Sequence, residues 1–217
     1  GGAYAKVSNL ALSGSLILSR GTLSPTTYSV YALSLTGSGG TFRGSTGLLD
    51  VNGNLTITAG TVIAPNTMTL SGSFTKSNGS FLASGSTLTL DGGNQTLSGA
   101  LTFKNLTKTV TAAKTLTFYP GHTYTVTGAL ILRGAVSALL SIRSGITDTA
   151  ASLKLVTGGT QTIDYLDVKD SNASSGLELL CYSDSEGCSN SLNNTNWRFS
   201  SSAAAEESSS SSSTATA

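Results

Sequence analysis

The sequence has few charged residues and few of the side chains that most enzymes and metal sites use. Of its 217 residues only 11% are charged, and it contains one His, one Met, one Trp and three Pro. A typical soluble domain is about a quarter charged. Ser and Thr instead make up roughly a third of the chain, far above ordinary usage. A chain made soluble by hydroxyls rather than charges is predicted to be secreted, either extracellular or on a cell surface.

Long apolar runs and basic clusters are also missing. No stretch approaches the roughly 20 apolar residues that cross a bilayer, so we expect no membrane span. No group of Lys and Arg with interleaved aromatic residues is present, so we expect no nucleic-acid partner. The 38% hydrophobic content still permits a sizeable core.

The few charges are unevenly distributed along the chain. Residues 1–147 hold nine Lys or Arg and two acids, a net charge of +7, whereas residues 148–217 hold three bases and nine acids, a net charge of −6. Chance explains such a split in a sparse set of charges. Opposite charge at the two ends would also favour head-to-tail association of successive molecules. We therefore predict self-association, as a homo-oligomer or a filament.

Short alternating segments with a central Gly recur along the chain. They are "ALSGSLIL" (11–18), "DVNGNLTI" (50–57), "TLSGSFTK" (69–76), "TLDGGNQT" (89–96) and "TVTGALIL" (125–132). Their glycines are 39, 19, 20 and 36 residues apart, which indicates one or two copies of a unit of about 18–20 residues. Such a unit fits one coil of an all-β, right-handed parallel β-solenoid (β-helix) of about seven to eight coils. A β-sandwich also alternates, but it does not require a constant repeat.

The organisation predicted from this repeat has three parts. Residues 1–146 form coils, residues 147–199 form the terminal coils and a cap that includes the Cys181–Cys188 loop, and residues 200–217 form a Ser/Ala-rich tail or linker. Trp197 and Phe199 are expected to cover the end of the apolar core. The side chains expected to point inward are Leu16, Leu18, Leu55, Ile57, Met68, Leu70, Leu88, Leu90, Val126, Leu130 and Leu132.

Threonines on the opposite face fall at nearly the same intervals. If the coils stack, one predicted surface ladder consists of Thr67, Thr69, Thr87, Thr89, Thr107, Thr109, Thr125 and Thr127. A second set is Thr56, Thr58, Thr75, Ser77, Thr96, Ser98, Thr115 and Thr117. Lys108 would then point into the core, so we expect a bulge there, or a pairing of Thr109 with Thr111 instead. Such ladders could organise water as in ice-binding solenoids, or could simply stack the coils.

The only two cysteines enclose the short polar loop "CYSDSEGC" (181–188). In an oxidising compartment Cys181 and Cys188 would form a local disulfide. A zinc site would need about four ligands, and the single His122 is far away in sequence.

Candidate catalytic and metal-binding groups are sparse. Asp164, Asp167 and Asp170 form a local acidic cluster that is a candidate Ca²⁺ site, although the spacing of a calcium loop is absent. Glycan-cleaving enzymes need two carboxylates on one face. Asp50, Asp91 and His122 are predicted to be turn residues and not catalytic groups. The two aspartates lie beside turn glycines, and His122 has no evident partner. We expect no cofactor and no catalytic residues.

Asparagines that begin Asn-x-Ser/Thr sequons are candidate glycosylation sites in a secreted chain. They are Asn54, Asn78, Asn94, Asn105, Asn172 and Asn193.

Three segments resemble those of a known class of protein. "LDGGNQTLSGALTFKNLTKTVTAAKTLTF" (90–118), "IDYLDVKDSNASSG" (163–176) and "NNTNWRF" (193–199) are similar to secreted bacterial parallel β-helix surface repeat proteins of adhesin-like or autotransporter-passenger-like architecture. The resemblance implies surface display with an adhesive or scaffolding role. It implies that the Cys pair is a structural staple, and it carries over no catalytic residues.

The sequence therefore favours a non-enzymatic extracellular structural or adhesive β-solenoid, a building block of a bacterial surface layer or extracellular filament. One alternative is a ligand-binding module, either an adhesin for surface glycans or an ice binder. Another is a polysaccharide-degrading enzyme that uses Asp164 and Asp167.

Overall fold

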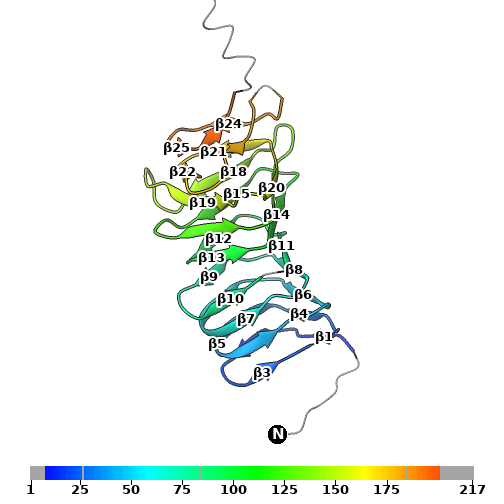
Figure 1. The fold of residues 1–217 in the computed structure, drawn as a ribbon. Coiled ribbons are helices and arrows are strands. Elements are labelled where there is room, and N and C mark those ends of the chain that lie inside the picture. The colour runs from blue at the N-terminus through cyan, green and yellow to red at the C-terminus, as the bar shows by residue number, and fades with distance from the viewer. Residues whose placement is uncertain (1–7, 26, 84, 184, 201–217) are drawn as a thin grey trace, which may run out of the picture.

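The computed structural model describes residues 8–25, 27–83, 85–183 and 185–200, and in this part of the chain it contains β-strands and no helix. The coils stack along one axis, with the first and the last coil at opposite ends of a rod (Figure 1). Equivalent strands of successive coils pair in parallel. Parallel pairing confirms the predicted β-solenoid and excludes a sandwich of hairpins. The predicted tail at residues 201–217 lies outside the described residues.

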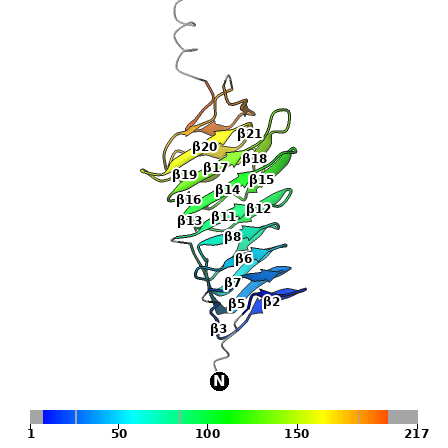
Figure 2. The ribbon, with the colours of Figure 1, turned by 90° about the vertical axis from the view of Figure 1, so that its right-hand side faces the viewer.

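Three parallel sheets form the faces of the rod (Figure 2). Sheet A contains, in spatial order, β1 (Leu10–Ala11), β4 (Val30–Ala32), β6 (Leu48–Val51), β8 (Thr67–Leu70), β11 (Thr87–Leu90), β14 (Asn105–Thr109), β17 (Ala129–Arg133) and β20 (Thr160–Asp164). It runs over most of the rod and bears part of the predicted Thr ladder.

Sheet B faces the core from another side. Its main path is β2 (Ser15–Leu18), β5 (Ser34–Arg43), β7 (Leu55–Ile63), β9 (Phe74–Lys76), β12 (Gln95–Ser98), β15 (Lys114–Phe118), β18 (Leu140–Ser144), β21 (Leu166–Val168) and β24 (Ser189–Asn190), while β3 (Thr22–Leu23) and β10 (Ser80–Leu82) pair with the far ends of β5 and β7. The nine strands of this path give about nine turns in the described chain, slightly more than the seven to eight predicted.

The third face, sheet C, exists only in the C-terminal half. It contains β13 (Leu101–Phe103), β16 (Thr123–Val126), β19 (Ala151–Leu155), β22 (Ser171–Asn172) and β25 (Asn194–Thr195), and a separate pair is formed by β23 (Leu179–Leu180) and β26 (Trp197–Arg198). In the N-terminal half β5 and β7 are long, and each pairs with one strand through its first part and with another through its far part, β2 and β3 for β5 and β9 and β10 for β7. The stacking continues without a break across residue 146, through the pairing of β18 with β21.

Alternation along each strand places the apolar side chains inside. The side chains predicted to point inward are buried, except that Leu16 in the first coil is only partly buried. Edge-to-face aromatic pairs continue the core through the middle of the rod, with ring centroids 4.8 Å apart for Phe74 and Phe81 and 6.1 Å apart for Phe81 and Phe103. Trp197 and Phe199 both pack against the core near its C-terminal end, and their rings stack with centroids 6.1 Å apart. Among the described residues no helix is long and apolar enough to cross a bilayer.

Candidate functional site

The predicted Thr ladder on sheet A is present in part. Thr67 pairs with Thr87, and Thr69 pairs with Thr89, so two rows of hydroxyls stand on neighbouring coils. Thr107 extends the second row, because it pairs with Thr89 rather than with Thr87.

The remaining rungs were predicted in the wrong register. Thr109 pairs with Arg133, so it lies beside a cation and not beside a threonine. Thr125 belongs to β16 in sheet C, where it pairs with Thr102 and Lys154. Thr127 follows β16, and its amide donates to the Phe103 carbonyl. The predicted ladder of eight therefore ends after Thr107.

Variable coil length explains the error. The sequence separation between bonded residues of adjacent coils is 19 for Asp50 and Thr69, 18 for Thr87 and Asn105, but 24 for Asn105 and Ala129. Each added side of a coil lengthens it, so intervals of about 20 residues lose the register once sheet C begins. As a result, the copies of the repeat do not lie at equivalent places in their coils. Gly128 lies just before a strand of sheet A, β17, whereas Gly53 lies just after one, β6.

The second hydroxyl set forms a different ladder on sheet B. Thr56 pairs with Thr36 and with Thr75, and Thr75 pairs with Ser98. Thr96 pairs with Thr117 in a neighbouring row. The predicted side-by-side alignment of Thr75, Thr96 and Thr115 is therefore wrong by two residues at β12.

Many of these polar side chains bond one coil to the next. The Thr69 hydroxyl donates to Asp50 Oδ1 at 2.8 Å, and the Ser71 hydroxyl donates to Asp91 Oδ1 at 2.8 Å. Asp91 directly follows β11 as expected of a turn residue, but Asp50 lies within β6. The hydroxyl rows therefore contribute in part to the stacking of coils, and their register shifts between coils.

Asparagines at the corners make similar bonds. Asn54 Oδ1 accepts the Ser73 amide at 2.8 Å, and Asn94 Oδ1 accepts the Thr115 amide at 2.9 Å. Among the six sequons, Asn54, Asn78, Asn94 and Asn193 are exposed, whereas Asn105 and Asn172 are half-buried. A glycan attaches at Nδ2, and this atom donates to Thr87 Oγ1 in Asn105 and to Asp170 Oδ1 in Asn193.

Lys108 points into the core, so the expected bulge or alternative pairing does not occur. Its side chain is 0% exposed, and its ammonium donates to the carbonyls of Gly92 and Gly93 at 3.0 and 3.1 Å and to Gln95 Oε1 at 2.6 Å. Gln95 in turn donates to Leu70 O and to a second carbonyl of the coil below. All three ammonium hydrogens thus have acceptors. Burial lowers the pKa of Lys108 from 10.5 to about 8, an effect that the charge of Asp91 partly opposes.

The three carboxylates of the acidic cluster are held apart. Asp164 ends a sheet A strand and binds Arg133, with Nε 2.9 Å from Oδ2, and Asp167 binds Arg143 on sheet B. Asp170 is 3% exposed at the next corner, where its carboxylate accepts the Asp148 amide at 3.1 Å. In the described ranges no three His, Cys, Asp or Glu side chains are grouped so as to hold a metal ion, so the candidate Ca²⁺ site is not assembled.

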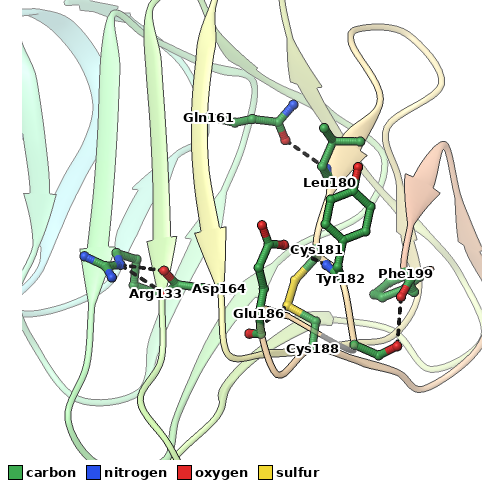
Figure 3. The surroundings of a disulfide bond; sticks show 10 residues. Arg133, Gln161, Asp164, Leu180, Cys181, Tyr182, Glu186, Cys188 and Phe199 are labelled. Atoms are coloured by element: carbon green, nitrogen blue, oxygen red, sulfur yellow. Dashed lines mark hydrogen bonds and ion pairs between the residues drawn. A yellow bond between two sulfur atoms is a disulfide. The ribbon is translucent and has the colours of Figure 1, made fainter. Parts of the chain in front are cut away.

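The Cys181–Cys188 disulfide is present, as predicted (Figure 3). A shallow pocket of about 240 Å³ beside it is lined by two carboxylates, Asp164 and Glu186. Glu186 Oε2 accepts the Tyr182 amide at 2.7 Å, which holds the loop closed. Because Asp164 is already bound to Arg133, both carboxylates have structural partners. Glu186 carries no sequence signal for this place, because it lies in the loop that the disulfide closes.

His122 lies exposed in the turn before β16, as expected.

A groove of about 440 Å³ lies between β10 and β13, where sheet C begins. One wall is formed by Phe81, Leu82 and Ala83, and the other by Thr102, Phe103, Lys104 and Thr127. Within the described chain β10 pairs only with β7, and β13 pairs only with β16, so no strand ladder joins the two walls. Sequence periodicity gave no signal for this groove, because it arises where two neighbouring coils diverge.

The first described coil ends in open edges. Among the described residues, β1, β2 and β3 each pair with a strand of the second coil only. Leu10, Leu16 and Leu23 of this coil are only partly buried, and Ile17 is 64% exposed.

Comparisons with protein-family models, with curated proteins and with solved structures find no match to this chain. The functional interpretation therefore rests on the geometry described above.

Proposed function

We propose that the chain is a non-enzymatic, extracellular structural or adhesive β-solenoid, a building block of a bacterial surface layer or filament whose rods associate end to end. The observation that carries the proposal is the open first coil. It presents parallel strand edges that no described residue pairs, together with partly buried leucines, and such edges are templates for further strand pairing.

The charge distribution supports association, although less strongly than the sequence alone indicates. Arg133 and Arg143, counted with the basic part, form ion pairs with Asp164 and Asp167 of the acidic part. The coils before them retain Arg20 and Arg43, for which the structure shows no ion pair among the described residues. A disulfide is typical of proteins from oxidising compartments, which supports secretion.

Ala11 offers a direct test of the open edge. Leu10 and Leu12 donate their amides to the second coil, so the Ala11 amide, between them, is directed to the open side. Ala11→Pro removes this donor and leaves the internal ladder intact. Ala11→Ser is the matched control, because it keeps the amide.

We expect light scattering to show association of the wild-type chain that increases with protein concentration, and negative-stain microscopy to show elongated assemblies. Ala11→Pro should shift this association to higher concentration, and Ala11→Ser should not. A wild-type chain that stays a monomer at every concentration would contradict the proposal.

A further inference from the structure

The outer face of sheet C carries hydroxyls and lysines. Alternation along its strands directs Thr102, Thr125 and Lys154 outward, and the register places these three side by side on successive coils. Lys104 directly follows β13 and Thr127 directly follows β16, so both lie beside this row. None of the five strands of sheet C, as the structure describes them, contains Asp or Glu. The positive charge of the lysines is therefore not cancelled within the sheet.

Both lysines of this face are free to bind an anion. Lys104 and Lys154 are only half-buried, and neither forms an ion pair with any described residue. Glu178, which lies two residues after Gly176 in the coil next to Lys154, is bound to Arg198, with Oε2 2.7 Å from Nη2. An external carboxylate would therefore meet two cations that have no acidic partner in the described chain.

The aliphatic stem of each lysine lies against a glycine of the next coil. A Cβ at Gly128 would come within 3.1 Å of Lys104 Cε, and a Cβ at Gly176 would come within 3.0 Å of Lys154 Cγ. Each side chain therefore runs along the rod, with its stem restrained by packing. A restrained side chain loses less rotamer entropy when it binds a ligand.

Solvent reaches this face from the groove beside it. Thr102, Lys104 and Thr127 are among the residues that line its volume of about 440 Å³. The aromatic rings in the strands of sheet C are buried, so the face offers no platform on which bases could stack, and this disfavours single-stranded nucleic acid as the ligand. The threonine hydroxyls both donate and accept hydrogen bonds, as the hydroxyls of a sugar do. Cations among hydroxyls fit a chain of acidic sugars.

We propose that the outer face of sheet C binds an acidic polysaccharide, whose carboxylates contact Lys104 and Lys154 and whose hydroxyls bond to Thr102 and Thr125. The two lysines belong to coils two steps apart, about 10 Å along the rod, so they contact different sugars of one chain. This ligand class deepens the adhesive role proposed above and rests on it, but it does not require the rods to associate end to end.

Isothermal titration calorimetry of the full chain with oligosaccharides of mannuronate and of glucuronate tests the proposal. We expect binding that weakens as salt is added, and no binding of the methyl esters, which keep the sugars but lack the charge. Lys104→Glu and Lys154→Glu should each weaken binding by tenfold or more. Lys114→Glu is the matched control, because this half-buried lysine at the start of β15 in sheet B lies outside the face, and it should leave binding unchanged.

Two further variants separate binding from folding and from a general attraction of polyanions. Lys154→Arg keeps the charge and should keep the affinity within about threefold. Thr125→Val removes one hydroxyl at similar volume and should weaken uronate binding severalfold, but not the binding of polyglutamate.

Ala11→Pro should retain uronate binding, so a failure of end-to-end association is distinguishable from a failure of this site. Three results would overturn the proposal: no uronate binds, the methyl esters bind as tightly as the acids, or polyglutamate and single-stranded DNA bind as tightly as the uronates. A loss in Lys114→Glu equal to that in Lys104→Glu would overturn it too, because the net charge rather than this face would then determine affinity.

Discussion

The backbone turns differently in the two halves of the rod. In the described residues up to 100, positive φ occurs only at glycines: Gly21, Gly39, Gly60, Gly79 and Gly99. In residues 101–200 seven other residues adopt it, and these are Ser137, Asp148, Tyr165, Asp170, Leu192, Asn193 and Asn196. A left-handed conformation costs a non-glycine residue about 1–2 kcal/mol, so the C-terminal corners need compensating bonds.

Side-chain bonds supply this compensation in the C-terminal half. The ion pairs that the structure shows in the described chain all lie between residues 133 and 198, and the disulfide is there too. Asp170 illustrates the principle: its φ is 56°, and its buried carboxylate accepts the Asp148 amide and the Asn193 side-chain amide. In the N-terminal half the positive-φ corners are glycines, and at Gly39, Gly60 and Gly99 the backbone of the preceding coil lies too close for a Cβ. The left-handed corners of the same parallel stack are thus accommodated in two ways, one by glycine and one by residues with specific side-chain partners.

Gly60 and Gly158 allow the largest test of this difference between the two halves. Gly60 has a φ of 76°, and a Cβ there would lie 2.2 Å from the Gly40 carbonyl oxygen of the coil below. Gly158 has a φ of 86°, but nothing lies within 4 Å of its Cβ position. We expect Gly60→Ala to lower the free energy of unfolding by about 3–5 kcal/mol, since strain and steric overlap add.

Gly158→Ala is the control, with an expected loss of about 1–2 kcal/mol from strain alone. Urea unfolding followed by circular dichroism measures both values. Equal losses in the two variants would show that close contact between coils at glycine does not stabilise the N-terminal half.

The fold was predictable because its main signal is local. Alternation and turn glycines determine which side chains face inward, and this holds even for Lys108, whose inward direction follows from strict alternation on β14. The predicted bulge there was wrong because Gln95 and two glycine carbonyls satisfy the ammonium. That network joins residues 13 to 16 positions apart in sequence, and no local pattern reveals it.

The candidate site was less predictable because it depends on register between coils. Thr125 lies in sheet C because coils lengthen where a third side begins. Asp164 and Asp167 lie on different sheets because the chain turns a corner at Tyr165, between β20 and β21. The groove beside Leu82 depends on the same change, since β10 and β13 follow different paths around the rod. A repeat interval of about 20 residues carries no information on where a coil gains a side.

Removing the disulfide tests whether the C-terminal half depends on its specific bonds. For the double variant Cys181→Ser/Cys188→Ser we expect a loss of about 2.5 kcal/mol, the chain-entropy value for so short a loop. The loss should be confined to the last coils: hydrogen exchange should accelerate in β23 and β26 and stay unchanged in β5 and β7. Uniform acceleration along the rod would show that both halves unfold as one unit.

Lys108 lies where the two halves meet, and its pH dependence measures the cost of a buried charge at that junction. Its pKa is about 8 in the folded chain and 10.5 in the unfolded chain, so the unfolded state binds more protons between these pH values. The free energy of unfolding should therefore rise with pH in this window, by about 2 kcal/mol between pH 7.5 and 9.5. Burial raises the pKa of Tyr124 to about 12, which would reverse the trend only above pH 10.

Lys108→Met is the reference for this measurement, because it has no ammonium to titrate and keeps a similar volume. It leaves the Gln95 oxygen and two carbonyls without their donor, so we expect it to be less stable than the wild type at every pH. Its free energy of unfolding should nevertheless lack the wild-type rise between pH 7.5 and 9.5. If both proteins gain the same stability over that range, the rise comes from other groups, and the junction holds the lysine charge without an energetic penalty.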